Sequence, residues 1–538
     1  MKKVKENYRL GLSLGEFTRA IGGTVVLSVL FATVLISCAS LPELRPLQPT
    51  VAVDSASAGK LVATVATVVT SATSATSTIQ LKSAAGTLTA KQSQLVLDRL
   101  DRGAPDTGIF ERHLAVENAL SSEPLTTGNK VALFQDGRST YAAMDKAILA
   151  AKDHINVETY IIEDDEIGQA FIKSLIDKQS AGVQVNLIYD SVGSIGTPRT
   201  FFEGLTAAGA SVLEFNPVNP LTAKKGWEIN QRDHRKLLII DGKTVFLGGV
   251  NISSVYSSGS FGRHRAVTPD TKTGEKRVPW RDTHVQIDGP VVASFQRLFL
   301  STWAKQKGEP LKPRVYFPVL KAEGKEVIRA IGSSSDDAPL RRTASSGIAA
   351  TALTADTRAA VGPDAPADKA AAPIYTTLLS AIASAETSIF LTNAYFVPDL
   401  QLIEALKLAV KRGVNVKIIL PGHTDSGLVF HAGRSYYQSM LEGGIEIYER
   451  SDKLLHSKTV LIDGVWSSVG SSNLDWRSFL HNDEVVAIVL GTAFGTQMLK
   501  MFEQDLAASQ QVTLEQWESR PLLLRVKESA ARLWAYWL

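Results

Sequence analysis

Residues 234–242 read HRKLLIIDG and residues 456–464 read HSKTVLIDG, so the pattern H-x-K-x4-D occurs twice in one chain. The agreement extends beyond the motif, because a Gly and an Asn follow each His by fourteen and seventeen residues. These are Gly248 and Asn251 in the first copy, and Gly470 and Asn473 in the second. Two copies with the same spacings indicate a duplication rather than chance. We therefore expect two related halves.

His and Lys supply complementary chemistry in each copy. A neutral imidazole can act as a nucleophile or exchange a proton near neutral pH, and Lys brings a positive charge suited to phosphate oxygens. The apolar run that leads to Asp-Gly predicts a buried strand ending in a tight hairpin turn. His234 with Lys236, and His456 with Lys458, would then face one cavity. Two such sets would place one His on each side of a phosphodiester phosphorus.

Other positions of the repeat have roles that follow from their place. Asp241 and Asp463 complete the two motifs but lie at the turns, and we interpret them as turn-capping carboxylates rather than catalytic bases. Small residues after the second strand would let a phosphate approach the backbone. Asn251 and Asn473 can donate amide hydrogens to the phosphate oxygens.

A catalytic His also needs a carboxylate behind its ring to fix its tautomer and orientation. Asp282, in WRDTHVQIDG, and Glu484, in HNDEVVAIVL, each follow one motif and stand at the head of an apolar strand. They are the candidates, and the alternative is that both are surface carboxylates. The only Cys is Cys38, so no Cys cluster is available for a metal, and the His pair is better explained as nucleophile and acid than as metal ligands.

Composition describes an ordinary globular protein. The 538 residues allow two or three domains, and 44% hydrophobic with 21% charged residues is typical of chains that bury real cores. The 57 basic and 54 acidic residues give a net charge of +3. This argues against a dedicated nucleic-acid binder, which would be strongly basic.

The first 38 residues have the pattern of a secretory signal: a basic start, an apolar run and small residues at a cleavage site. The string 35–38, LISC, resembles the bacterial lipobox, in which Cys38 would be lipidated and become the mature N-terminus. The alternative is an uncleaved anchor helix. Both place the body of the protein outside the cytoplasm at a membrane. Ala39 resembles the sorting pattern of outer-membrane lipoproteins.

Composition and periodicity divide the rest of the chain. The predicted segments are an Ala/Ser/Thr-rich tether (39–88), a short helical lead-in (89–130), a first α/β domain (131–332), a flexible Ala/Ser/Asp-rich insert (333–372) and a second α/β domain (373–538). The second domain ends in an amphipathic helix within 520–538. We expect this helix to pack on the core, and a position on a membrane surface is the alternative.

Both α/β segments alternate strands with helices. The expected strands are 131–137, 155–162, 183–190, 388–396 and 414–422, and the expected helices are 140–154, 169–182, 373–387 and 400–413. This alternation predicts two layered α/β sandwich domains.

These residues resemble the phospholipase D superfamily and, within it, the bacterial cardiolipin synthases. The paired H-x-K-x4-D with its trailing G-G/S-x-N is the superfamily signature. The strings NAYFVPD (393–399), GSSNLDWRSFLHNDE (470–484), RDTHVQIDGP (281–290) and QWESRPLLLRVKE (516–528) are similar to the synthase branch. The resemblance covers about residues 131–538, apart from the insert.

The resemblance implies two tandem phospholipase D-like sandwich domains with one active site at their pseudo-twofold interface. It implies a covalent phosphohistidine intermediate without a metal or other cofactor. His234 would be the nucleophile, His456 the acid and base, and Asp282 and Glu484 the carboxylates behind the rings. The expected function is a phosphatidyltransferase, most simply a cardiolipin synthase that uses the phospholipid phosphatidylglycerol at a membrane.

Three alternatives remain open from the sequence. A phospholipase D that hydrolyses head groups would use the same intermediate. A secreted nuclease of the superfamily would need a basic groove. A non-catalytic lipid-binding scaffold is disfavoured because all six motif residues are intact. The insert, the tether and the lipobox depart from the family pattern and leave the membrane side and the lipid open, and nothing predicts an oligomeric state.

Overall fold

The structure is a computed structural model that describes residues 79–100, 108–121, 123–218, 230–257, 280–334 and 372–535. All described residues belong to one compact unit. The predicted signal segment with Cys38, the tether up to residue 78 and residues 335–371 of the predicted insert lie outside the described residues.

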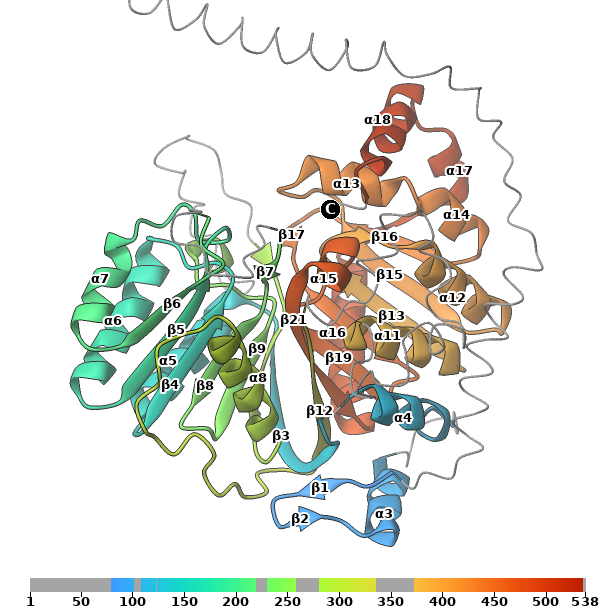
Figure 1. Ribbon diagram of the computed structural model, residues 1–538. Coiled ribbons are helices and arrows are strands. Elements are labelled where there is room, and N and C mark those ends of the chain that lie inside the picture. Colours follow the sequence, from blue (N-terminus) through green and yellow to red (C-terminus); the bar gives the residue numbers. More distant parts are fainter. Residues whose placement is uncertain are drawn as a thin grey trace, which may run out of the picture. The chain divides into compact units, whose positions relative to one another are not determined.

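The first half is a mixed sheet with helices on both faces (Figure 1). Its strands are β3 (Thr126–Phe134), β4 (His154–Thr159), β5 (Gln184–Asp190), β6 (Ser211–Phe215), β8 (Lys236–Ile240), β9 (Thr244–Gly248) and β11 (His284–Asp288). Pairing gives the order β6-β5-β4-β8-β9-β11-β3, in which β6–β5 and β5–β4 pair in parallel and all other neighbours pair antiparallel. Its helices are α5 (Gly137–Ala150), α6 (Glu166–Ser180), α7 (Thr200–Ala207) and α8 (Val292–Lys305).

The second half repeats this order. Its strands are β12 (Glu326–Ser333), β13 (Ser388–Asn393), β15 (Asn415–Pro421), β16 (Glu446–Arg450), β18 (Lys458–Ile462), β19 (Trp466–Gly470) and β21 (Asn482–Leu490), paired as β16-β15-β13-β18-β19-β21-β12. Its helices are α11 (Pro373–Ser384), α12 (Leu400–Lys411), α13 (Gly427–Arg434), α14 (Tyr437–Glu442), α15 (Trp476–Leu480) and α16 (Thr492–Ala507). The predicted pair of α/β domains is thus confirmed.

Alternation along the central strands explains the layers. In β8, Leu238 and Ile240 face a core shared with α5, α6 and α7, whereas Leu237 and Ile239 face a core that includes residues of α8. This second core also contains Val485 and other residues of β21, together with residues of α16. The two halves therefore share one apolar interior, and they cannot separate without exposing it to water.

Strand β12 belongs to the second half, although the predicted first domain runs to residue 332. It pairs with β21 from Val327 to Ser333, and its Glu326–Ile328 end also pairs with β3. β12 and β3 are equivalent strands, so the two sheets join edge to edge. The predicted insert consequently falls between the first strand and the first helix of the second half, where the first half has only residues 135 and 136.

Smaller elements flank these two halves. They are β1 (Lys82–Ser83), β2 (Gly86–Thr87), α3 (Ala90–Leu100), α4 (Ile109–Leu120), β7 (Arg232–Asp233), η2 (Ser254–Tyr256), β10 (Trp280–Arg281), β14 (Phe396–Val397), β17 (Leu454–Leu455), β20 (Leu474–Asp475), β22 (Ser509–Val512), α17 (Leu514–Glu518) and α18 (Leu522–Arg532). The β1–β2 hairpin lies inside the segment predicted as tether, and α4 packs on α11.

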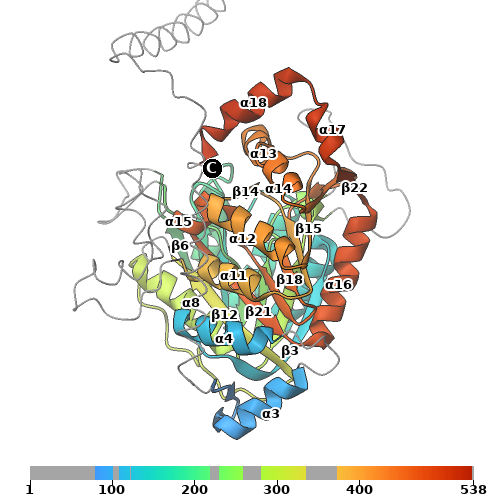
Figure 2. The same cartoon turned by 90° about the vertical axis from the view of Figure 1, so that its right-hand side faces the viewer.

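The C-terminal helix packs on the core as expected, since it contacts α13 and its Ala531 belongs to the apolar core, but its large apolar residues do not take part. α18 forms where it is expected, beside α13 and α17 (Figure 2). However, its buried residues are Glu528 and Ala531, while Leu522, Leu523 and Val526 are exposed. The reason is that ion pairs of Glu528 hold the polar side of the helix against the protein. Within the described ranges, no helix combines the length and the apolar character that crossing a bilayer requires.

Candidate active site

The two motifs fold into equivalent hairpins. β8 and β18 each run through the apolar residues of their motif and turn at Asp-Gly. Asp241 and Gly242 have φ of 52° and 62°, and Asp463 and Gly464 have φ of 52° and 69°. Asp and Gly are the residues that tolerate two successive positive φ angles in a tight hairpin. The predicted strand and turn are therefore present in both halves.

The motif aspartates lie far from the histidines. Six residues, five of them in the strand, separate His from Asp in each motif, so the two ends lie about 23 Å apart along an extended chain. The carboxylate of Asp241 accepts the backbone N–H groups of residues 152–154, and that of Asp463 accepts those of residues 386–388, at 2.8–3.1 Å. Each caps the start of a parallel strand. This position supports a structural role for both.

Each motif histidine is held against the opposite half. β7, just before His234, pairs in parallel with the start of β21, and the His234 N–H donates to the Asp483 carbonyl at 2.9 Å. β17, just before His456, pairs in parallel with β10, and the His456 N–H donates to the Arg281 carbonyl at 2.8 Å. Both histidines precede their strands, which begin at the motif lysines.

The carboxylates cross in the same way. His234 Nδ1 lies 3.0 and 3.1 Å from the two oxygens of Glu484, and His456 Nδ1 lies 2.7 Å from Asp282 Oδ2. Each imidazole therefore donates its Nδ1–H to a carboxylate from the other half, which turns its Nε2 away from that carboxylate. The two predicted orienting residues are brought to the histidines, and neither histidine is complete within its own half.

Two buried arginines stabilise this crossed pairing, in which each histidine contacts the carboxylate of the other half. Arg235 Nε donates to the Glu484 carbonyl at 3.1 Å, and its Nη1 contacts Glu158 at 3.3 Å. Arg281 forms a two-pronged ion pair with Asp505 at 2.9 and 2.8 Å. Bidentate charged contacts of this kind are geometrically demanding. They fix the backbone next to each histidine and its partner.

The motif lysines lie beside the imidazoles. Lys236 Nζ donates to the His234 carbonyl at 2.5 Å, and Lys458 Nζ donates to the His456 carbonyl at 2.6 Å. Lys458 Nζ is also 3.1 Å from His456 Nε2. Each lysine acts electrostatically on the histidine of the other half as well as its own, so the four groups form one charged centre.

Burial controls the protonation of this centre. It lowers the pKa of His234 to about 4 against the opposing charge of Glu484, and it lowers the pKa of His456. Burial likewise lowers the pKa of Lys236 to about 7 and that of Lys458 to about 8. Both imidazoles are consequently neutral near pH 7, and the lysines hold their charge less firmly than exposed lysines do.

The orienting carboxylates stay ionised in spite of their burial. Burial alone would raise the pKa of Glu484, but His234 and Lys236 outweigh it and bring the pKa to about 2. In the same way His456 outweighs burial and lowers the pKa of Asp282. Each buried carboxylate therefore keeps its negative charge, which fixes the tautomer of the ring it contacts.

The small residues after each hairpin serve the carboxylates rather than a phosphate. A Cβ on Gly249 would lie 2.1 Å from Asp282 Oδ1, so only Gly leaves room for that carboxylate. The Ser471 hydroxyl donates to Glu484 Oε2 at 2.5 Å. The small residues at these positions thus have another explanation than the approach of a phosphate. Gly249 makes space for Asp282, and Ser471 donates a hydrogen bond to Glu484.

The two asparagines have different surroundings. Asn251 Oδ1 accepts the Ile161 N–H at 3.2 Å, and its Nδ2 donates to the Tyr256 hydroxyl at 2.8 Å. Asn473 is buried, and its Oδ1 has no hydrogen-bond partner within the part of the chain that the structure describes. Their role in binding phosphate stays a prediction.

Aromatic rings that the sequence analysis did not single out surround the histidines. The Tyr160 ring is 4.9 Å from the His234 ring, and Trp280 and Tyr395 lie 5.1 and 6.0 Å from the His456 ring. The available signal was positional, since Tyr160 directly follows β4 and Tyr395 follows the equivalent strand β13 after one residue. Such rings exclude water from the reacting groups.

Comparisons with known proteins agree with this geometry. The family model of the phospholipase D-like domain of cardiolipin synthase matches residues 144–259 and 378–506, one motif in each match. A cardiolipin synthase of Halalkalibacterium halodurans is 34% identical over 416 residues, covering 77% of this chain and 73% of the relative. The major cardiolipin synthase of Bacillus subtilis (strain 168) is 31% identical over 412 residues, covering 76% and 75%. A solved phosphatidylserine synthase of Haemophilus influenzae Rd KW20 shares the fold, with a TM-score of 0.52 at 14% identity over 76% of this chain and 95% of that one.

Proposed function

The chain belongs to the cardiolipin synthase family of phospholipase D-like proteins, and on this premise we propose that it transfers a phosphatidyl group from one phosphatidylglycerol to another. The observation that carries the proposal is the crossed pair of histidines and carboxylates. Two buried, neutral imidazoles, each fixed by an ionised carboxylate, are what a two-step displacement at phosphorus requires.

The first step forms a covalent intermediate. His234 Nε2 attacks the phosphorus of the donor lipid, a P–N bond forms, and the bond from phosphorus to the departing glycerol oxygen breaks. Two features suit His234 to this role: its pKa of about 4 keeps it neutral, and Nε2 has no hydrogen-bond partner among the described residues. Glu484 stabilises the positive charge that the ring acquires.

His456 supplies the proton that the leaving glycerol needs. Its Nε2 lies 3.1 Å from the Lys458 ammonium, so the pair shares a proton. A bound phosphate is negatively charged and favours the protonated form of this pair. Lys236 and Lys458 also offset the charge that spreads over the phosphate oxygens in the transition state.

In the second step the proton moves in the opposite direction, to His456. A hydroxyl of a second phosphatidylglycerol gives its proton to His456 and attacks phosphorus, and the P–N bond to His234 breaks. The products are cardiolipin and the glycerol released in the first step. The aromatic rings around both histidines support transfer to a lipid alcohol over transfer to water, because they limit the access of solvent.

Incubation of the purified protein with phosphatidylglycerol vesicles tests this function. Mass spectrometry should show cardiolipin and free glycerol rising together. Phosphatidic acid as the main lipid product would identify a phospholipase D instead, and no turnover of any phosphatidyl lipid would contradict the proposal.

We further propose that the protein acts in the cell envelope, with its body outside the cytoplasm and Cys38 lipidated. The basis is the lipobox-like string 35–38 after an apolar run. Palmitate labelling should mark the wild type and miss Cys38→Ser. Equal labelling, or a mature chain that begins at Met1, would favour an uncleaved anchor.

A further inference from the structure

Helix α18 turns its apolar side away from the protein. Leu522, Val526 and Leu533 repeat at spacings of four and seven residues, so they line one side of the helix, and Leu523 and Trp534 lie on the adjacent stripe. All five are exposed, from 56% for Val526 to 83% for Leu533. A helix of a soluble domain normally buries such a stripe. A contiguous exposed one marks a binding surface.

The opposite side of α18 explains this orientation. Glu528 is 2% exposed and lies 3.0 Å from Arg520 Nε and 3.7 Å from Arg434 Nε. A buried carboxylate with two arginine partners is costly to pull out of its site. The helix is therefore fixed through the side that carries Glu528, and its apolar side consequently faces outward.

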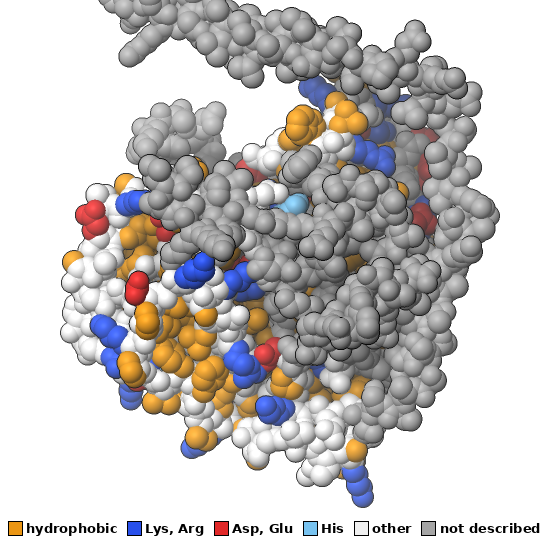
Figure 3. Space-filling model, in the orientation of Figure 1, with side chains coloured by type: hydrophobic (Ala, Val, Ile, Leu, Met, Phe, Trp, Pro, Cys, Tyr) orange, Lys and Arg blue, Asp and Glu red, His pale blue; other side chains and the backbone are white. Residues whose placement is uncertain are grey.

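The exposed charges of α18 are all positive. Arg525, Lys527 and Arg532 are exposed, and the one acidic residue of the helix is the buried Glu528. Figure 3 shows hydrophobic side chains gathered beside Lys and Arg side chains at the edge of the view where α13 and α18 lie. An apolar stripe flanked by basic residues matches the interface of a bilayer that contains anionic lipid.

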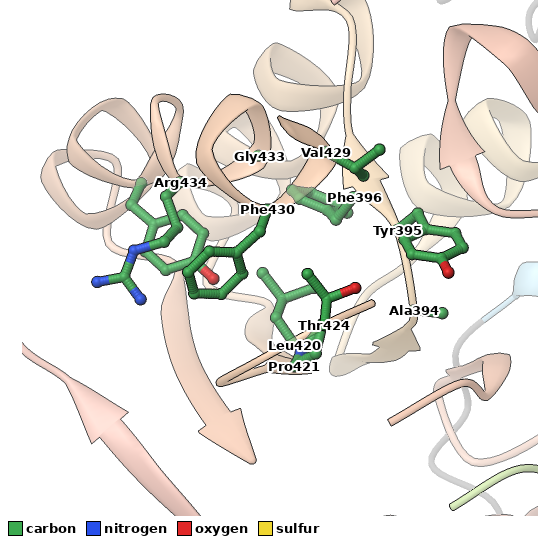
Figure 4. A pocket seen from close by; sticks show the side chains of 11 residues that line it. Ala394, Tyr395, Phe396, Leu420, Pro421, Thr424, Val429, Phe430, Gly433 and Arg434 are labelled. Atoms are coloured by element: carbon green, nitrogen blue, oxygen red, sulfur yellow. The ribbon is translucent and has the colours of Figure 1, made fainter. Parts of the chain in front are cut away.

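A cavity lies between this surface and the reaction centre. α13, which packs against α18, lines it with Val429, Phe430 and Arg434, and Tyr395 closes it near His456. Figure 4 shows Arg434 at one end of the cavity and Tyr395 at the other. The cavity thus lies between α13, which contacts α18, and Tyr395, whose ring is 6.0 Å from that of His456.

We propose that α18 docks on an anionic bilayer, with the side chains of Leu522, Leu523, Val526, Leu533 and Trp534 in the lipid interface. The second half, which carries His456, would then rest on the membrane. The docking itself requires no turnover. Only its link to the reaction rests on the proposed function.

A fluorescent label tests the docking directly. In full-length protein with Cys38→Ser, the substitution Leu523→Cys carries an environment-sensitive fluorophore, and Lys146→Cys on α5 carries the same label as an exposed control. The proteins are reconstituted into phosphatidylglycerol vesicles whose acyl chains bear bromine. The label at 523 should shift to shorter wavelength and be quenched about fivefold more than the label at 146. In vesicles of phosphatidylcholine alone, this difference should shrink.

Two results of this experiment would overturn the proposal. One is equal quenching at 523 and 146 in phosphatidylglycerol vesicles. The other is a wavelength shift at 523 without quenching by bromine, which would mean that a second copy of the chain covers the stripe.

A pair of variants connects the docking to turnover. Leu523→Glu with Val526→Glu should lower turnover of vesicle-borne phosphatidylglycerol about tenfold and leave turnover of a short-chain, water-soluble analogue unchanged. Ser529→Gln, beside the stripe, should change neither. Equal loss on both substrates would contradict an action through the membrane. Absence of synthase activity in the wild type would defeat the proposed function but not the quenching result.

Discussion

His234 and His456 occupy equivalent places in the two halves, but their surroundings differ. Glu484 meets His234 with both oxygens and accepts a hydrogen bond from Ser471, whereas Asp282 meets His456 with one oxygen and fills the space above Gly249. Lys458 reaches His456 Nε2, while Lys236 reaches only the backbone carbonyl of His234.

The difference shows how a duplicated motif acquires two roles. Both histidines keep the backbone geometry and the crossed carboxylate, so neither half can act alone. The side chains around them then suit different functions. The Nε2 of His234, which has no hydrogen-bond partner in the described part of the chain, suits attack on phosphorus, and the Nε2 of His456, next to an ammonium, suits proton transfer. In the proposed mechanism the first half supplies the nucleophile and the second half supplies the acid and base.

Removal of either histidine should have the largest effect on activity and tests the roles assigned to the two. His234→Ala and His456→Ala should each lower kcat by about four orders of magnitude or more, because the two act as one unit. With a donor whose leaving group needs no acid, His456→Ala should retain radiolabelled phosphatidyl on the protein, and His234→Ala should not. Label on the His234→Ala protein would reverse the assigned roles.

The lysines offer a milder test through pH. Both lysine pKa values are lowered by burial, to about 7 and about 8, so the positive charge is present below these values and lost above them. Neutral His234 is needed for attack, so its pKa of about 4 sets the acid limb. The profile of kcat/KM against pH should rise through about pH 4, the pKa of His234, and fall between about pH 7 and 8, where the lysines lose their charge. A plateau that continues to pH 10 would show that the lysine charges are not required.

The turn aspartates should affect stability more than chemistry. Asp463 is buried and Asp241 is only partly so, and each accepts three backbone N–H groups that Ala would leave unpaired. Asp463→Ala should destabilise the fold by about 2–4 kcal/mol, and Asp241→Ala by less. Thermal unfolding and kcat of the folded variants measure this. Native stability with lost turnover would mean that these aspartates take part in the reaction.

The insert should matter least. The first half joins its first strand to its first helix with residues 135 and 136, so the equivalent junction in the second half, 334 to 372, can be closed by a short link. Replacing residues 335–371 with a short Gly/Ser linker should leave activity and melting temperature close to those of the wild type. Loss of either would show that the segment makes contacts on which the halves depend.

Local sequence patterns predict much of the fold, but they do not predict that each histidine pairs with the carboxylate of the other half. The repeated Asp-Gly turns and the alternating apolar residues of β8 and β18 identify the duplicated halves. By contrast, the order of residues suggests that Asp282 serves His234 and Glu484 serves His456, since each carboxylate follows that histidine in the chain. The opposite pairing arises from the contact of β7 with β21 and of β10 with β17, which is long-range and leaves no local signal.

Two other features could not be read from the sequence for related reasons. β12 looks like the last strand of the first half, and only its pairing with β21 assigns it to the second. The hydrophobic pattern of α18 shows that the helix is amphipathic but not which side faces the protein. That side is set by the contact of Glu528 with Arg434, a residue far away in the chain.

The crossed pairing is tested most directly by the burst kinetics of two variants on a phosphatidyl donor with a nitrophenol leaving group. Asp282→Asn impairs His456, which the first step of this donor does not need, so we expect a rapid burst of nitrophenol and accumulation of phosphatidyl on His234 by mass spectrometry. Glu484→Gln impairs His234 itself, so we expect slow release, no burst and no adduct. A burst with Glu484→Gln and none with Asp282→Asn would contradict the crossed arrangement.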